Sequence, residues 1–118
     1  MVPLLSEPQL KLEGSAWTLL LWVCDPFDDQ YSFREFFVAI VAVLQQVHDA
    51  KLTLPPEKLR EDFVDGTLRW GTLVYDVYFE RSLGYVQFSN ASEPNTRELL
   101  DVLESSFVWR RGTENIAG

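Results

Sequence analysis

Apolar residues alternate with polar residues near the start of the chain, in the period-two spacing of half-buried strands. Residues 10–13 alternate between leucine and a charged residue, and Gly14 and Ser15 offer a two-residue turn before the apolar segment 16–24. This arrangement predicts a β-hairpin. Its second strand is apolar on both faces, so we expect it to lie in the middle of a sheet.

A three- to four-residue spacing of apolar side chains predicts two helices. Ser32, followed three residues later by Glu35, has the pattern of a capping box and precedes an apolar run, so we expect a helix over residues 33–50. A second helix is predicted over residues 95–107, with Ser92 or Asn95 as its N-cap. One stripe of the first helix should be buried against the sheet: Phe33, Phe36, Phe37, Ile40, Leu44 and Val47.

Residues 59–89 have the pattern of strands throughout. Asp65 and Gly66 form a strong hairpin signal, residues 81–84 supply a second turn, and Gly71 indicates a bulge. Three strands in a meander are therefore expected. The chain is predicted to be a single α+β domain over residues 1–118, in which an antiparallel-rich, five-stranded sheet carries two helices on one face, in the order ββαβββα.

Composition restricts the classes of partner. The chain has 10 Lys plus Arg against 18 Asp plus Glu, a formal net charge of −8, which opposes binding to nucleic acid or to an anionic membrane. A basic protein is the favoured partner. The longest apolar run, residues 36–44, is about half the length of a membrane-spanning helix, so no such helix is expected.

The compartment is inferred from cysteine usage and from the first residues. The single cysteine, Cys24, cannot form an intramolecular disulfide, and residues 1–5 lack the positive charge of a secretory signal. We therefore expect a cytoplasmic protein.

Conventional catalytic and metal-binding patterns are weak. Cys24 and His48 are the one thiol and the one imidazole, but no local motif surrounds them. The acidic cluster of Asp25, Asp28 and Asp29 does not have the spacing of a calcium-binding loop. We therefore expect no catalytic residue, no metal and no cofactor.

The remaining candidate is a surface. Asp76, Tyr78 and Glu80 share the face of a predicted strand that points away from the core, and we expect Trp70 and Tyr85 to extend it. Aromatic anchors among acidic side chains suit recognition of a basic protein. The sequence thus favours a non-catalytic, acidic protein-binding module, one concrete form of which is an immunity or antitoxin-type inhibitor of a basic toxic enzyme.

Two alternatives stay open. A second copy of the chain, forming a homodimer, or the N-terminal segment could cover the sheet face that the helices leave bare. A small-ligand-binding protein or an enzyme would instead have a pocket between sheet and helices, with this expected lining: Trp17, Trp22, Phe37 and Tyr75. A deep pocket with convergent polar groups would favour the latter, and a closed core with an open aromatic face would favour the binding module.

Overall fold

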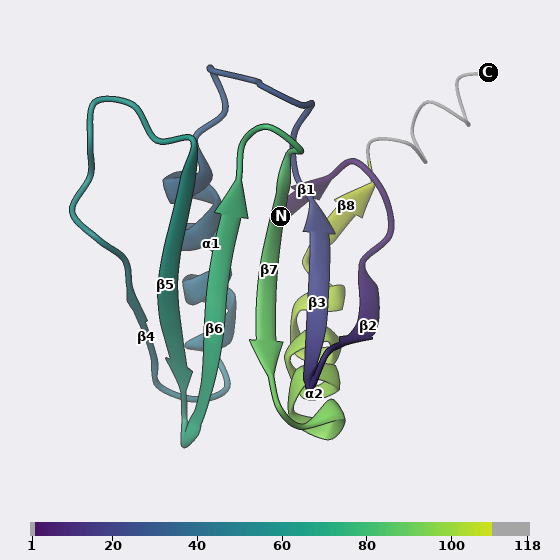
Figure 1. Ribbon diagram of the computed structural model, residues 1–118. Coiled ribbons are helices and arrows are strands. Elements are labelled where there is room, and N and C mark those ends of the chain that lie inside the picture. Colours follow the sequence, from purple (N-terminus) through teal and green to yellow (C-terminus); the bar gives the residue numbers. More distant parts are fainter. Residues whose placement is uncertain (1, 110–118) are drawn as a thin grey trace.

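The computed structural model, which describes residues 2–109, is an α+β protein with one antiparallel sheet and two helices packed on the same face of it (Figure 1). The strand order across the sheet is β2-β3-β7-β6-β5-β4. The strands are β2 (Gln9–Glu13), β3 (Ala16–Trp22), β4 (Ala50–Thr53), β5 (Phe63–Trp70), β6 (Leu73–Glu80) and β7 (Tyr85–Asn90), and the helices are α1 (Phe33–Leu44) and α2 (Glu93–Glu104). The predicted class is confirmed, with six strands in the sheet rather than five.

The additional strand exists because the first helix is shorter than predicted. The Ser32 hydroxyl accepts a hydrogen bond from the Glu35 amide, which confirms the N-cap, but α1 ends at Leu44. The side chain of Gln45 donates to the Ala50 carbonyl at 3.1 Å, and the chain turns back to form β4 at the sheet edge. Val47, predicted to continue the buried stripe, is exposed beyond the helix end.

The ends of the described chain form a second, small sheet. β1 (Val2–Leu4) pairs in parallel with β8 (Phe107–Trp109), and Val2 and Leu4 are buried. Ser92 is the N-cap of α2, and its hydroxyl accepts from the Asn95 amide. The prediction that this helix extends to Phe107 is wrong, because Phe107 pairs with Val2 instead.

Two of the predicted turns are confirmed and one is wrong. Gly14 and Gly84 have positive φ angles, of 60° and 77°, in the turns after β2 and β6. Asp65 and Gly66, however, lie inside β5, and the β5–β6 turn comes at Gly71, which has a φ of 61° where a bulge was predicted. Gly66 is required for a different reason: a Cβ there would run into the Thr53 carbonyl of the neighbouring edge strand.

The core lies between the sheet and the helices. Phe37, Ile40 and Leu44 are each no more than 1% exposed, as predicted. Phe33 stacks on Phe79 of β6 with ring centroids 4.3 Å apart, so the first turn of α1 is fixed on the sheet. This packing leaves the opposite face of the sheet as the surface on which the candidate side chains gather.

Candidate functional site

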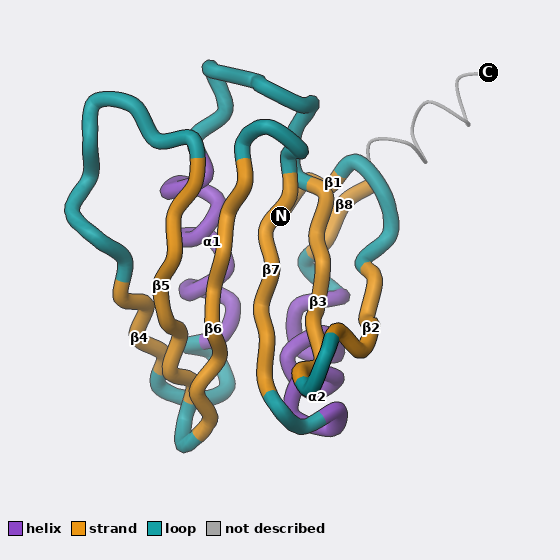
Figure 2. Tube along the Cα trace, in the orientation of Figure 1, coloured by secondary structure: helices purple, strands orange, loops and turns teal. Residues whose placement is uncertain are grey.

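Both helices lie on one side of the sheet, so no helix of the described chain covers the other face (Figure 2). Side chains alternate along each strand, and the buried members of β6 are Tyr75, Val77 and Phe79. The residues between them therefore point to the uncovered face, which we call the open face.

Four aromatic side chains form a continuous row across the open face. Trp22 of β3 meets Tyr85 of β7 edge to face at 5.5 Å between ring centroids, and Tyr85 lies 6.1 Å from Tyr78 of β6. Tyr78 in turn lies 6.4 Å from Phe63 of β5. These four residues, the aromatic row, come from four adjacent strands, with Phe63 the most accessible at 60% exposure.

Glu80 is held at the centre of this row by two hydrogen bonds. The Tyr78 hydroxyl donates to one carboxylate oxygen and the Ser82 hydroxyl donates to the other at 2.7 Å. The bond from Tyr78, followed by that from Ser82, holds the pKa of Glu80 below its ordinary value. The same bond to Glu80 is the main reason that the pKa of Tyr78 is raised, so the pair stays as a neutral phenol and an anionic carboxylate at neutral pH.

Four of the five predicted surface residues lie on the open face. Tyr78, Tyr85 and Glu80 are brought together, and Asp76 is exposed two positions before Tyr78 on the same strand. Asp65 of β5, directly opposite Tyr78, adds another exposed carboxylate. The same face also carries two exposed basic residues, Lys51 and Arg69, which lie opposite each other on β4 and β5 near the β5–β6 turn. The carboxylates therefore gather at the aromatic end of the face.

The prediction for Trp70 is wrong. Trp70 is 1% exposed and lies on the helix side of the sheet, where its indole N–H donates to the Leu44 carbonyl at 3.0 Å. The cause is the position of the turn: a continuous strand would have placed residues 70 and 76 on one face, but a hairpin after Trp70 pairs it with Leu73 on the core side. Trp70 therefore caps the end of α1.

Trp22 and Phe63 are the members of the row that the surface prediction missed. Trp22 alternates with the buried Leu21, which signalled that it points away from the core, but its neighbour Tyr85 is more than sixty residues away in sequence. Phe63 is hard to assign from the sequence because Asp65 and Gly66 predict a hairpin two residues later, whereas they lie inside β5. In both cases the missing information was strand register.

The open face is not equally accessible everywhere. Thr18 and Leu20 of β3 point to it but are buried, and the Thr18 and Ser89 hydroxyls are hydrogen-bonded at 3.0 Å. Phe63 and Asp76, on β5 and β6, are exposed. The most accessible part of the open face therefore lies on β5 and β6, beside the β6–β7 turn.

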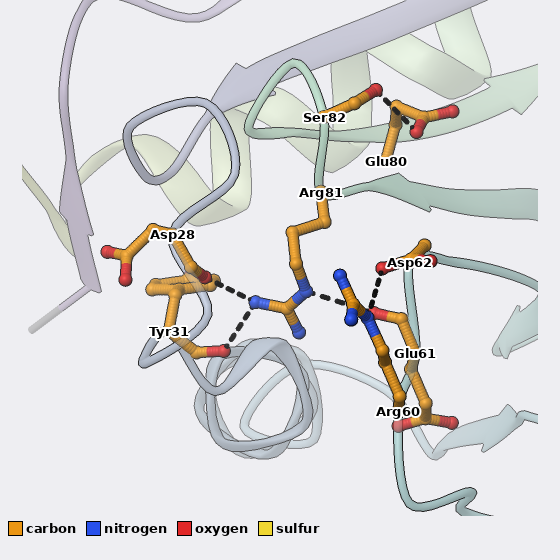
Figure 3. Close-up of polar contacts among 8 residues, drawn as sticks. All are labelled: Asp28, Tyr31, Arg60, Glu61, Asp62, Glu80, Arg81 and Ser82. Atoms are coloured by element: carbon orange, nitrogen blue, oxygen red, sulfur yellow. Dashed lines mark hydrogen bonds and ion pairs between the residues drawn. The ribbon is translucent and has the colours of Figure 1, made fainter.

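That turn belongs to a group of three loops, residues 23–32, 54–62 and 81–84, which we call the loop end of the sheet. Figure 3 shows Arg81 between the other two loops. Its guanidinium donates to the backbone carbonyls of Asp28 and Tyr31 in one loop and to that of Glu61, at 3.0 Å, in the other. It also lies over the Phe79 ring, 5.3 Å from the centroid.

Backbone bonds strengthen this junction. The Arg81 amide donates to the Asp62 carbonyl at 2.8 Å, and the Phe27 amide donates to the Arg81 carbonyl at 2.9 Å. Arg34 of α1 adds a bidentate pair with the Glu61 carboxylate, at 2.9 and 2.6 Å, which lowers the pKa of Glu61. The loops are thus fixed to each other and to the helix.

The two residues that could form a nucleophilic pair are far apart. The Cys24 amide bonds to the Gly84 carbonyl at the loop end, whereas His48 packs on Trp70 beside the opposite β5–β6 turn. The eight residues of β6 separate these ends by about 25 Å. Burial, followed by the charge of Asp28, raises the pKa of the Cys24 thiol to about 11, which disfavours the thiolate.

The predicted ligand pocket is not assembled. Trp22 lies on the open face, whereas Phe37 and Tyr75 are buried on the other side of the sheet. The Tyr75 hydroxyl donates to the Asn95 carbonyl at 2.7 Å, and no buried side-chain polar atom among the described residues lacks a partner. A surface groove between α1 and the β4 edge includes Phe37, Leu52 and Leu54 in its lining, but Trp22 and Tyr75 are not part of it.

No group of three or more His, Cys, Asp or Glu side chains within residues 2–109 is arranged to hold a metal ion. No helix in that part of the chain is long and apolar enough to cross a membrane. Comparison of the chain with protein-family models, with curated proteins and with solved structures finds no match.

Proposed function

We propose that this protein is a non-catalytic protein-binding module whose open face engages a basic protein. The observation that carries the proposal is the aromatic row, which crosses four strands with Glu80 fixed among its rings. Tyr and Trp are frequent anchors of protein interfaces because they bury a large area with little loss of conformational freedom. Their placement in a sheet adds rigidity, so little further ordering is needed on binding.

Charge selects the class of partner. Asp65, Asp76 and Glu80 share the open face, and the chain as a whole carries a formal net charge of −8. A second copy that placed the aromatic row on the same row about a two-fold axis would bring these carboxylates together, which opposes that arrangement of a homodimer. A Lys- and Arg-rich surface would instead be attracted to it and oriented by it.

A concrete form of this function is inhibition of a basic toxic enzyme, in the manner of an immunity protein or antitoxin. Such an inhibitor needs a complementary surface and no active site of its own. The rigid open face and the acidic balance support this form, which rests on charge and size.

The proposal is tested by affinity capture from the source cell with mass spectrometry. Three immobilised baits are compared: the wild-type chain, a Tyr78→Ala/Tyr85→Ala variant, and a Leu12→Ala variant as control. Leu12 is about as exposed as Phe63, at 56%, but it lies on β2, the edge strand farthest from β4 and β5. We expect a basic protein to be retained by the wild type and the control and lost by the double variant.

Capture of the same proteins by all three baits would overturn the proposal, and so would a specifically retained partner that is acidic. Retention of the chain itself would show that the open face is a homodimer interface. Because Tyr78 and Tyr85 are only partly buried, we expect the double variant to fold. Circular dichroism and thermal unfolding of each bait check this.

A further inference from the structure

Exposed apolar side chains are concentrated at the loop end. Among the described residues, eight large hydrophobic side chains are exposed, and four of them lie in or beside the three loops that Arg81 joins. These four are Phe27, Leu59, Phe63 and Leu83. Phe63 is also the last member of the aromatic row, so the apolar surface continues from the open face onto the loop end.

Phe27 is the most distinctive of these residues. It is 71% exposed, and it is the one non-glycine residue of the described chain with a positive φ, at 59°. That left-handed conformation is disfavoured for an aromatic residue, so surrounding contacts must maintain it. The Phe27 amide is bonded to the Arg81 carbonyl, and the Arg81 guanidinium holds the carbonyl of the next residue, Asp28.

A large apolar side chain that is presented to solvent by a fixed loop is suited to be an interface anchor. Most of the ordering that would otherwise oppose binding is already complete before the partner arrives. The two sides of the Phe27 loop, by contrast, are acidic: Asp25 precedes it, and Asp28 and Asp29 follow it. An apolar centre with a charged rim is the usual composition of a protein interface.

The charge of the loop end also indicates the occupant. The three loops hold six acidic and three basic residues, and Arg34, on the adjacent helix, is paired with Glu61. A second copy of this chain, or an anionic membrane, would meet repulsion at this surface. A basic protein would meet attraction.

We infer that the interface wraps from the aromatic row over the loop end, where Phe27 enters an apolar pocket bordered by Lys or Arg on the same basic protein. This inference rests on the proposed function, because the partner of both surfaces is one molecule. Arg81 acts as a positioning residue: it touches no partner and holds the Phe27 loop in the geometry that presents the ring.

The test begins with the photo-cross-linking residue benzoylphenylalanine, placed in the full chain at position 27, 78 or 12. We expect positions 27 and 78 to cross-link to the same basic protein in the source cell, and position 12 to give no such product. The cross-linked peptide from position 27 should contain apolar residues with Lys or Arg nearby. That protein, purified, is then the probe for affinity measurements with the variants.

Phe27→Ala should weaken its binding by about 30-fold or more, the loss typical of an interface anchor. Phe27→Gly should weaken it as much while leaving the fold at least as stable, because glycine accepts a positive φ. Lower affinity without lower stability distinguishes an interface anchor from a residue that only supports the fold. Leu12→Ala should leave the affinity unchanged.

Arg81→Lys tests the positioning role. It keeps the positive charge but cannot bond the Asp28, Tyr31 and Glu61 carbonyls together. We expect faster amide hydrogen exchange at Phe27, Asp28 and Tyr31, together with weaker binding. Phe27→Ala should weaken binding without that change in exchange at Asp28 and Tyr31.

The outcomes separate the two proposals. Cross-linking from position 78 but not from position 27, with unchanged affinity of Phe27→Ala, would overturn this inference and leave the proposed function in place. Absence of cross-links from both positions would overturn both. Cross-links from position 27 to a second copy of the chain, or to an acidic protein, would overturn the choice of partner.

Discussion

At the scale of single residues, Ile40 tests how α1 is held on the sheet. Ile40→Ala should lower the free energy of unfolding by about 2–5 kcal/mol, because the side chain is 1% exposed and its removal leaves a cavity in a packed core. Val38→Ala on the same helix, where the side chain is 71% exposed, should change it by less than about 0.5 kcal/mol. Urea unfolding of the two variants measures the difference, and equal losses would contradict the observed orientation of the helix.

Glu80 gives the open face a predictable pH dependence. Hydrogen bonds from Tyr78 and Ser82 lower its pKa in the folded state, whereas in the unfolded chain the carboxyl returns to about 4.3. A lowered folded pKa means that the stabilisation is present above the unfolded value and is lost as the pH falls through the folded value.

Glu80→Gln should therefore be less stable than the wild type at pH 7, and the difference should shrink as the pH falls below about 4. Unfolding midpoints in urea, measured between pH 7 and pH 3, give the profile. Tyr78→Phe removes one of the two hydrogen-bond donors to Glu80. Its stability at pH 7 should lie between that of the wild type and that of Glu80→Gln. A difference that stays constant over this range would show that these bonds do not stabilise the ionised carboxyl.

At the scale of elements, the turn after β6 depends on a glycine that another loop approaches closely. Gly14 and Gly84 both have positive φ, but a Cβ at Gly14 would meet nothing within 4 Å, whereas one at Gly84 would collide with the Cys24 carbonyl. Gly14→Ala should cost about 1–2 kcal/mol, the penalty of the left-handed conformation alone. Gly84→Ala should cost clearly more, as measured by thermal or urea unfolding, and similar costs would argue that the two loops are not in close contact.

Most of the elements could be predicted because their signals are local. The N-cap at Ser32 and the turn glycine at Gly84 act on the residues beside them, and both are present as predicted. The strand β4 and the β5–β6 turn could not be found in this way. Asp65 and Gly66 have turn propensity, but the close approach of Thr53 and the pairing of β5 with β6 outweigh it.

The same distinction explains the site. Asp76, Tyr78 and Glu80 lie on one strand, so alternation alone placed them together. Trp22 and Phe63 belong to the row only through the pairing of strands, which the sequence does not specify. Trp70 lies on the core side because the β5–β6 turn directly follows it. Face assignment is robust within a strand, and the set of neighbours across strands needs the register.

At the scale of the whole molecule, the net charge of −8 should act mainly on the rate of encounter with a basic partner. Such steering typically accelerates association by about 10 to 10³-fold at low salt. The screening length falls to about 8 Å at 0.15 M ionic strength, so the association rate should fall steeply with added salt. The aromatic contacts act after encounter, and the lifetime of the complex should therefore depend on salt much less.

Two variants should separate these effects in stopped-flow or surface-plasmon-resonance measurements with the captured basic protein. Asp76→Asn/Glu80→Gln should mainly lower the association rate, because both carboxylates lie on the face that meets the partner. Tyr78→Ala should mainly speed dissociation, by about tenfold or more if its ring is an anchor. Asp101→Asn/Glu104→Gln on α2 removes the same charge from the helix side and serves as the matched control. An equal loss of association rate in the two double variants would mean that only the total charge steers the encounter. If Asp76→Asn/Glu80→Gln lowers the association rate but leaves its dependence on salt as in the wild type, the encounter is not steered by these charges.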